Sequence, residues 1–399
     1  MSKLDLCEDI MTNFASETGL TDDHKPVTRY LWTDAFAVCN FLELYRQTTN
    51  EKYLQLALQL INQVHQVLGK YRGDDKRTGW ISNLNEAEGA EHPTAGGLRI
   101  GKLLKERHPD EAFDQRLEWE RDGQYFHYLT KWMHALNIAA FYSGNSVYTQ
   151  WALELAQTVH RHFVYLNPDD KQMYMYWKMS TDLSFPLVPS MGQHDPLDAL
   201  ITYLQLQESS KACDDISYKL SLEHEIITMR SICQHQRWIT TDSLGIGGLL
   251  TDAYFVLQLL VNNKEVCEWD LLSRLLEDAV FSLSAFVQSD ELSHPALYRL
   301  AFRELGLSIG LHAMECIQET LDQSRELVPN RLNLNKHINL LSRYLLLTES
   351  IESEWLKPAN QQATNWREHK NINEVMLVTS LMPHTYLTLN WATRCNQKL

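Results

Sequence analysis

Aspartate and histidine side chains gather at the start of an apolar segment in GQHDPLD, residues 192–198. Pro196 suits the first turn of a helix, which does not need the amide that proline lacks, and Asp195 just before it suits the helix cap. A cap needs no imidazole, so His194 is left unexplained. Asp198 lies one turn further, where a carboxylate is costly unless it faces a cavity. We therefore expect the reacting carboxylates here.

A second group precedes an apolar segment in EWERDGQYFH, residues 118–127. Gly123 separates the charged cluster from the helical pattern, so that Asp122 lies just ahead of the predicted helix and His127 within it. At the floor of a cavity, one of these side chains would act as acid or base and the other as its partner. The alternative is that Asp122 caps the helix and contacts no substrate.

A third junction is formed by Trp32 and Asp34, which begin the segment WTDAFAVCNFLELY. An indole beside a carboxylate suits a sugar ring, but an N-cap carboxylate next to a packed tryptophan explains the pair equally well. The side chains that would offer stacking surfaces to a sugar are Trp32, Trp80, Tyr125, Trp132 and Trp177.

Two outlying pairs are candidates for contacts with a substrate. Glu88 and His92 lie in an acidic loop ahead of a Gly-Gly turn, which is either a solvated loop or a lid over the site. Arg299 and Arg303 are four residues apart and share one face of a predicted helix. They would clamp a substrate carboxylate or pair with acidic neighbours.

Composition and motifs exclude several classes of ligand. The formal net charge of -15 argues against nucleic acid or an anionic membrane as a partner, because both need a basic face. No stretch reaches the ~18 uninterrupted apolar residues typical of a membrane span. The chain lacks HExxH and any Cys/His ligand spacing, so we predict neither a metal site nor a cofactor. The oligomeric state is left open.

The cysteines and the first residues indicate the cellular compartment. Seven cysteines are scattered without paired spacing, which fits reduced thiols better than a disulfide framework. The beginning of the sequence, MSKLDLCEDIMTNF, has acidic residues where a signal peptide needs an apolar run. We therefore expect a cytoplasmic protein.

The elements that must position these residues are helices in antiparallel pairs, an apolar helix alternating with an amphipathic one. Two long irregular segments, 72–122 and 164–193, interrupt the pairs, and we expect short strands near 80–84 and 98–103. About twelve helices in such pairs predict a single all-α domain, residues 1–399, with the form of an (α/α)6 toroid. An irregular helical array or an open solenoid is the alternative. The helices are predicted at 4–19, 30–46, 51–71, 124–142, 147–162, 195–206, 216–236, 247–260, 269–287, 295–319, 334–355 and 372–389.

Four segments carry a resemblance to a known superfamily: WTDAFAVCNFLELY, GWISNL, RDGQYFHYLTKWMHAL and GQHDPLDAL. Together they resemble the six-hairpin glycosidase superfamily, which includes unsaturated glucuronyl hydrolases, and the N-acylglucosamine 2-epimerase group shares its barrel. The resemblance implies a carbohydrate site at the barrel mouth, built from the ends of the inner helices and the long loops.

Three functions follow as hypotheses. The first is a glycoside hydrolase that uses two carboxylates. The second is a sugar epimerase or isomerase that uses a histidine pair, such as His127 and His194, to move a proton next to a carbonyl. The third is a protein without catalysis that binds a glycan or a partner protein.

Overall fold

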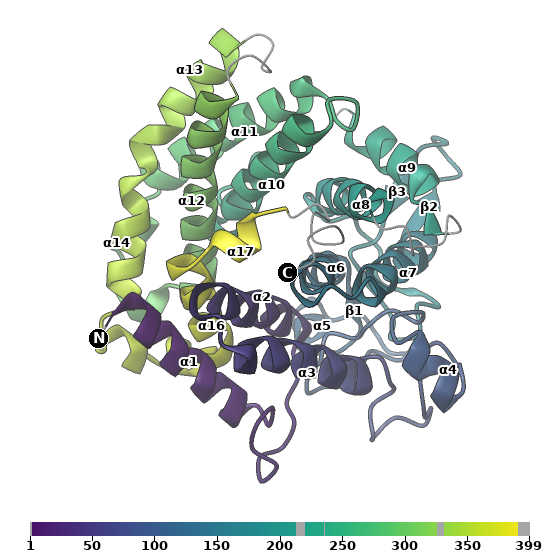
Figure 1. The fold of residues 1–399 in the computed structure, drawn as a ribbon. Helices are drawn as coiled ribbons and strands as arrows, with labels where there is room; N and C mark the ends of the chain where they lie inside the picture. The colour runs from purple at the N-terminus through teal and green to yellow at the C-terminus, as the bar shows by residue number, and fades with distance from the viewer. Residues whose placement is uncertain (1, 213–219, 235, 325–330, 390–399) are drawn as a thin grey trace. The chain divides into compact units, whose positions relative to one another are not determined.

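The computed structural model describes residues 2–212, 220–234, 236–324 and 331–389. Its described residues form two compact units, which we call the first unit (residues 12–235) and the second unit (residues 2–11 and 236–389). Helices are the main regular structure of both (Figure 1). Helix α1 (Lys3–Glu17) runs across the division between the units.

Three helical hairpins make up the first unit. Their helices are α2 (Leu31–Thr48) with α3 (Glu51–Leu68), α6 (Phe126–Ser143) with α7 (Val147–Phe163), and α8 (Asp195–Lys211) with α9 (Glu223–Cys233). The first helix of each pair is the more buried one: every residue of α2 from Leu31 to Leu44 is buried, whereas α3 buries one face. Helix α6 packs against both α2 and α8 (Figure 1). The alternation of inner and outer helices predicted from the sequence is therefore present.

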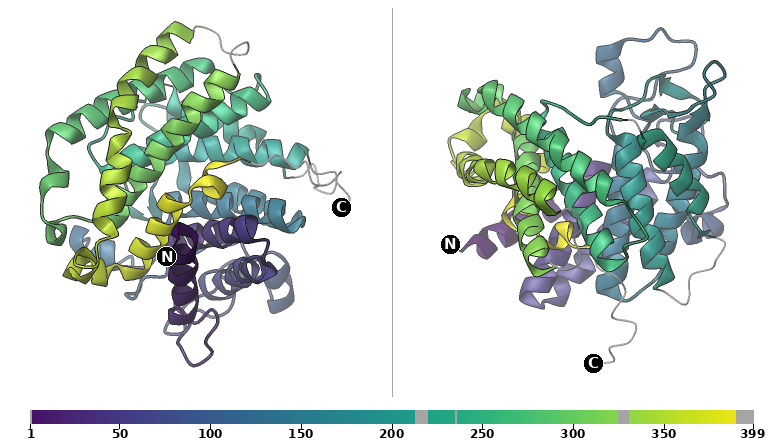
Figure 2. Two further views of the ribbon diagram at one scale, coloured as in Figure 1. Left: turned by 60° about the vertical axis from the view of Figure 1, so that its left-hand side comes forward. Right: turned by 90° about the horizontal axis from the view of Figure 1, so that it is seen from above.

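The second unit is organised around α12, which packs against α10, α14 and α16 (Figure 2). Its helices are α10 (Ser243–Asn262), α11 (Trp269–Gln288), α12 (Ala301–Gln323), α13 (Arg331–Leu341), α14 (Leu346–Trp355), α15 (Thr364–Glu368), α16 (Lys370–Leu381) and α17 (His384–Leu387). Short 3-10 helices span Glu291–Ser293, Ala296–Tyr298, Ser342–Tyr344 and Asn360–Gln362.

Glycines allow α10 and α12 to cross with their backbones in contact. A β-carbon on Gly247 would lie 2.0 Å from the carbonyl oxygen of Gly306, and one on Gly310 would lie 2.5 Å from that of Gly247. Real β-carbons do not approach so closely, so a larger residue would push the helices apart. Among the described helices, α10 alone is long and apolar enough to cross a membrane, but 67% of that window is buried inside the protein, as in a core helix.

The two long irregular segments of the first unit carry short elements. These are helices α4 (Glu86–Glu91) and α5 (Gln115–Glu120) and strands β1 (Gln124–Tyr125), β2 (Val164–Leu166), β3 (Met173–Met175), β4 (Lys178–Met179) and β5 (Pro186–Val188). The strands pair in antiparallel fashion as a three-stranded sheet in the order β1-β4-β5 and as a β2-β3 hairpin.

The strands predicted near 80–84 and 98–103 were wrong. Ile81 N–H donates to the Gly69 carbonyl and Arg99 N–H to the Leu68 carbonyl, so both segments bond to the end of α3 rather than to a neighbouring strand. Trp80, Ile81, Leu98 and Ile100 in these runs are buried, whereas Leu103 is exposed.

Helix boundaries also differ from prediction in three places. The helix expected at 295–319 begins only at Ala301, after two 3-10 turns. The one expected at 334–355 is broken by a 3-10 turn into α13 and α14. The one expected at 216–236 falls partly outside the described residues, and its described part is α9.

Candidate functional site

The N-terminal turn of α8 places Asp195 in an unusual position. His194 occupies the N-cap, and neither its side chain nor that of Asp195 caps the helix, so the sequence-based explanation of Asp195 as a cap does not hold. The Asp195 carboxyl is buried, and its Oδ2 has no hydrogen-bond partner among the described residues. A β-carbon on Gly192 would lie 2.1 Å from that oxygen, so only glycine leaves room for the carboxyl there.

The two carboxyl groups of this turn have different surroundings. Burial, reinforced by the nearby charge of Asp198, raises the pKa of Asp195 well above its usual value and so favours its carboxylic acid form. Asp198 instead faces a cation, because the Nζ of Lys131 on α6 lies 3.4 Å from its Oδ1. Environments that separate two carboxyl groups in this way are typical of acid and base pairs in enzymes.

His127, in the first turn of α6, lies beside the Asp195 acid. Its Nδ1 is 3.6 Å from Asp195 Oδ1, which is too long for a hydrogen bond. Burial lowers the pKa of His127 to about 4, although 30% of its side chain remains exposed. Because burial disfavours both charged forms, the two groups face each other as a neutral acid and a neutral imidazole rather than as an ion pair.

Aromatic rings surround this pair on the side of α2 and α6. The Trp32 ring lies 5.9 Å from the His127 ring and 5.2 Å from that of Tyr128, measured between centroids. Tyr125 stacks on His127 at 5.6 Å with an interplanar angle of 13°. The Nε1 of Trp32 is buried without a hydrogen-bond partner among the described residues, and so is the hydroxyl of Tyr125.

The stack of aromatic rings continues beyond Tyr125. Trp177 stacks on Tyr125 at 5.2 Å, and Trp119 lies on Trp177 at 5.0 Å. Sequence reasoning selected Tyr125 and Trp177 but missed Trp119. The signal for it was its place one residue after Glu118, inside the charged cluster that precedes α6.

Asp34 and Asp122 lie away from Asp195 in structural networks. Asp34 accepts hydrogen bonds from Arg29 Nη1 at 3.1 Å and from the N-cap amide of Tyr30 at 2.9 Å, and burial raises its pKa to about 6. Asp122 accepts from Arg99 Nη1 at 2.9 Å and from the Gly101 amide at 2.9 Å. Among the described residues, neither carboxylate forms a hydrogen bond or an ion pair with His127.

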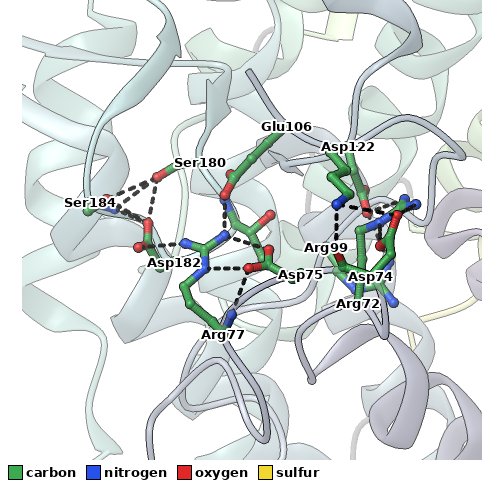
Figure 3. A network of polar contacts seen from close by, with 12 residues as sticks. Arg72, Asp74, Asp75, Arg77, Arg99, Glu106, Asp122, Ser180, Asp182 and Ser184 are labelled. Atoms are coloured by element: carbon green, nitrogen blue, oxygen red, sulfur yellow. Dashed lines mark hydrogen bonds and ion pairs between the residues drawn. The ribbon is translucent and has the colours of Figure 1, made fainter. Parts of the chain in front are cut away.

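A network of ion pairs joins the two long irregular segments (Figure 3). Arg77 contacts Asp75 at 2.9 Å and Glu106 in the first segment, and Asp182 at 2.9 Å in the second. Ser184 in turn donates to Asp182. The network fixes the loop that carries Trp177 against the loop that carries Trp119.

Four other predicted residues of the first unit have internal partners. Trp80 is buried beneath Lys70, whose Nζ lies 4.6 Å from its ring centroid. Trp132 is buried and donates from Nε1 to His65 at 3.2 Å. His92 pairs with Glu154 at 2.7 Å, and Glu88 completes the capping box of α4.

The predicted arginine pair belongs to the second unit and is split between two acids. Arg299 makes two hydrogen bonds to Glu304, at 2.8 and 2.6 Å, and Arg303 contacts Asp242 at 2.6 Å. Across the described residues, no group of three or more His, Cys, Asp or Glu side chains is placed to hold a metal ion.

Comparison with known proteins identifies the fold. No protein-family model matches the chain, and no curated protein matches it either. Among solved structures, it resembles the GH76A α-1,6-mannanase from Salegentibacter sp. HEL1_6 with 13% identity and a TM-score of 0.51, over 96% of this chain and 100% of that one. An inactive variant of the same mannanase in complex with α-1,6-mannotriose gives 13% identity and a TM-score of 0.52, over 97% and 100%.

The GH76 α-mannanase of Bacteroides thetaiotaomicron matches with 9% identity and a TM-score of 0.54, over 97% of each chain. At such low identity these similarities establish the fold and nothing finer. The chain has the (α/α)6 fold of these solved structures, as its sequence predicts.

Proposed function

We propose that the protein is a glycoside hydrolase in which Asp195 is the general acid. The observation that carries this proposal is a buried carboxyl with a raised pKa and an unpartnered oxygen, one helical turn from a second carboxyl that faces a lysine. A carboxylic acid that stays protonated at neutral pH can donate its proton to the oxygen of the leaving sugar.

In this mechanism Asp198 supplies the second carboxylate. As the glycosidic bond breaks, positive charge develops on the sugar ring, and a carboxylate nearby either attacks that carbon or activates water. Residues three apart on a helix lie on one face with β-carbons about 5–6 Å apart, so the two carboxyl groups can act on the same sugar. We assign Asp198 the role of this second carboxylate, as nucleophile or as base.

The surroundings of the acid support a carbohydrate as the ligand. Tyr128, half-buried beside His127, offers a ring against which the C–H face of a sugar can pack, and the buried rings of Trp32 and Tyr125 support it from behind. The buried Nε1 of Trp32 is a donor without a protein partner among the described residues, as a group that binds a substrate hydroxyl would be. The fold neighbours include an α-1,6-mannanase in complex with α-1,6-mannotriose, so mannooligosaccharides are the first substrates to test.

The test is hydrolysis of α-1,6-mannooligosaccharides and of a panel of other glycosides, measured as released reducing sugar. Asp195→Asn and Asp198→Asn should each lower kcat/KM by about 10²-fold or more, because each removes an acid–base or nucleophilic group. Asp34→Asn is the matched control, since this buried aspartate pairs with Arg29 and should affect stability rather than turnover. Wild-type activity in both α8 variants would disprove the assignment.

One observation favours a second candidate, a sugar epimerase or isomerase. The pKa of His127 is lowered to about 4, so its imidazole is neutral at pH 7 and able to accept a proton from carbon next to a carbonyl. Solvent deuterium distinguishes the two functions, because an epimerase incorporates it into recovered sugar at carbon and a hydrolase does not. If the protein binds sugar saturably but catalyses neither reaction, it is a glycan-binding protein without catalysis.

A further inference from the structure

A stack of aromatic rings connects the neighbourhood of Asp195 with the surface of the first unit. From His127 outward, the rings of Tyr125, Trp177 and Trp119 follow at centroid steps of 5.6, 5.2 and 5.0 Å. Trp119 ends the stack and is 49% exposed. Its exposed half leaves an aromatic surface that a ligand could cover.

Several apolar side chains close to Trp119 in the sequence are exposed. We call this set the α5 patch; besides Trp119 its exposed members are Leu103, Leu104, Phe113 and Leu117. They come from α5 and the loop ahead of it, within one stretch of the first unit. An exposed apolar cluster of this kind on a soluble protein is typical of a binding site.

Two lysines hold the backbone on either side of Trp119. The buried Lys178 donates from Nζ to the carbonyls of Glu118 and Arg121, at 2.5 and 2.9 Å, and Lys102 donates to the carbonyl of Trp119 itself. These ammonium groups satisfy the last carbonyls of α5, as cations at a helix C-terminus do. The indole is thereby fixed in place before a ligand arrives, which lowers the entropic cost of binding.

We propose that the α5 patch is a remote subsite for a polysaccharide chain whose reacting linkage lies at Asp195. This inference rests on the proposed function and deepens it, because it makes the substrate an extended glycan rather than a monosaccharide. A neutral sugar presents C–H groups on one face and hydroxyls at its edges. The C–H face packs on the exposed face of Trp119, while the hydroxyls remain in water.

Continuity with the candidate site favours a sugar chain over a protein as the occupant. Trp119 lies 6.2 Å from the ring of the buried Tyr125, which lies 5.6 Å from that of His127, so the two places are close enough for one bound chain of a few sugar units to contact both. A protein partner would require no such connection.

The experiment is native electrophoresis in gels that contain a soluble α-1,6-mannan, a neutral β-glucan or a polyuronate, with an empty gel as reference. Asp195→Asn is the parent protein, so that turnover does not alter the polymer. We compare the parent with versions that also carry Trp119→Ala or Trp119→Phe. Phe281→Ala is the matched control, because Phe281 is an aromatic side chain of the second unit with 53% exposure.

We expect at least one neutral polymer to retard the parent and the Phe281→Ala protein equally. Trp119→Ala should weaken affinity for that polymer by about tenfold or more, as loss of a well-placed tryptophan does at binding sites, and Trp119→Phe should retain most of it. Equal melting temperatures of the variants would exclude misfolding as the cause.

Three results would overturn the proposal: no retardation of the parent by any polymer, equal retardation with and without Trp119, or a dimer of the parent that Trp119→Ala converts to a monomer. The last would assign the α5 patch to a second copy of the chain. Failure of the proposed function is a separate result, because retardation that depends on Trp119 without any hydrolysis by the wild type would refute the hydrolase and leave the subsite intact.

Discussion

The carboxyl of Asp195 is held in its acid form at a cost to stability. Its pKa is raised in the folded protein, because the carboxylate is buried and lies near the charge of Asp198. Above the ordinary aspartate value of 3.8, the unfolded chain releases this proton while the folded protein keeps it. Stability is therefore lost as pH rises from that value toward the raised pKa.

Asp195→Asn should consequently raise the melting temperature at neutral pH while it abolishes hydrolysis. The amide removes the ionisable group and keeps the shape of the side chain, and groups that serve function at the expense of stability behave in this way. The measurement is the melting temperature of both proteins at pH 4 and pH 8. The gain should be larger at pH 8, and a gain that does not depend on pH would contradict the ionisation argument.

The sequence analysis selected Asp195, but part of its reasoning was wrong. The Asp-Pro pair predicted the start of a helix at the right place, but it also predicted a cap that Asp195 does not form. Its burial depends on Gly192 and on His127 from another helix. Local spacing does not report such contacts. For the same reason Asp122, an equally plausible acid in the sequence, proves to be a partner of Arg99.

Among the elements, the helices could be predicted better than the segments between them. Periodic apolar residues fixed α2, α3, α6 and α7 closely, because burial of one helix face repeats every turn. The segment 72–122 has no such repeat. Its form is set by single contacts with distant residues, such as those of Arg77 with Asp182 and of Arg99 with the end of α3.

Replacing Arg77 with methionine should loosen both irregular segments while the helices stay intact. The change removes the cation shared by Asp75, Glu106 and Asp182 and leaves three carboxylates close together. Hydrogen–deuterium exchange should become faster in residues 72–122 and 178–188. Arg161→Met on the exposed surface of α7 is the control. Unchanged protection of the loops would show that the network does not hold them.

At the scale of the whole molecule, apolar periodicity and hairpin order sufficed to predict the fold class, which the solved structures confirm. A single domain was predicted, and the described residues form two compact units. The second unit contains its own partly buried polar network. His312 on α12 contacts Glu352 on α14 at 3.0 Å and Glu315 at 3.2 Å, and Ser380 on α16 donates to Glu352 at 2.7 Å.

The His312 contacts should make stability depend on pH. Burial alone would lower the pKa of His312, but its bonds to Glu352 and Glu315 outweigh this effect and raise it. Its stabilisation is then fully present below the ordinary value of 6.5 and is lost as pH rises through the raised pKa. Burial alone would raise the pKa of Glu352, whereas the hydrogen bonds of its carboxylate lower that pKa. The contribution of Glu352 to stability is therefore lost only as pH falls through the lowered pKa. The charge of Lys3 acts on Glu352 in the same direction.

His312→Ala should therefore reduce the free energy of unfolding by about 1–3 kcal/mol at pH 6, the usual cost of leaving buried partners unsatisfied. The loss should shrink at pH 9, where the wild-type imidazole is no longer charged. Urea denaturation at both pH values measures it, with the exposed His24→Ala as the control. An equal loss at both values would contradict a charged His312.

The close crossing of α10 and α12 has a consequence for synthesis of the chain. The segment of α10 leaves the ribosome well before Gly306 and Gly310, on which Gly247 packs in the finished protein. Until those residues emerge, the nascent chain presents a helix as apolar as a membrane anchor with its main partner still unmade. Chaperones exist to shield such transient surfaces. The time that translation takes from residue 262 to residue 323 is therefore the time for which α10 lacks this partner during synthesis.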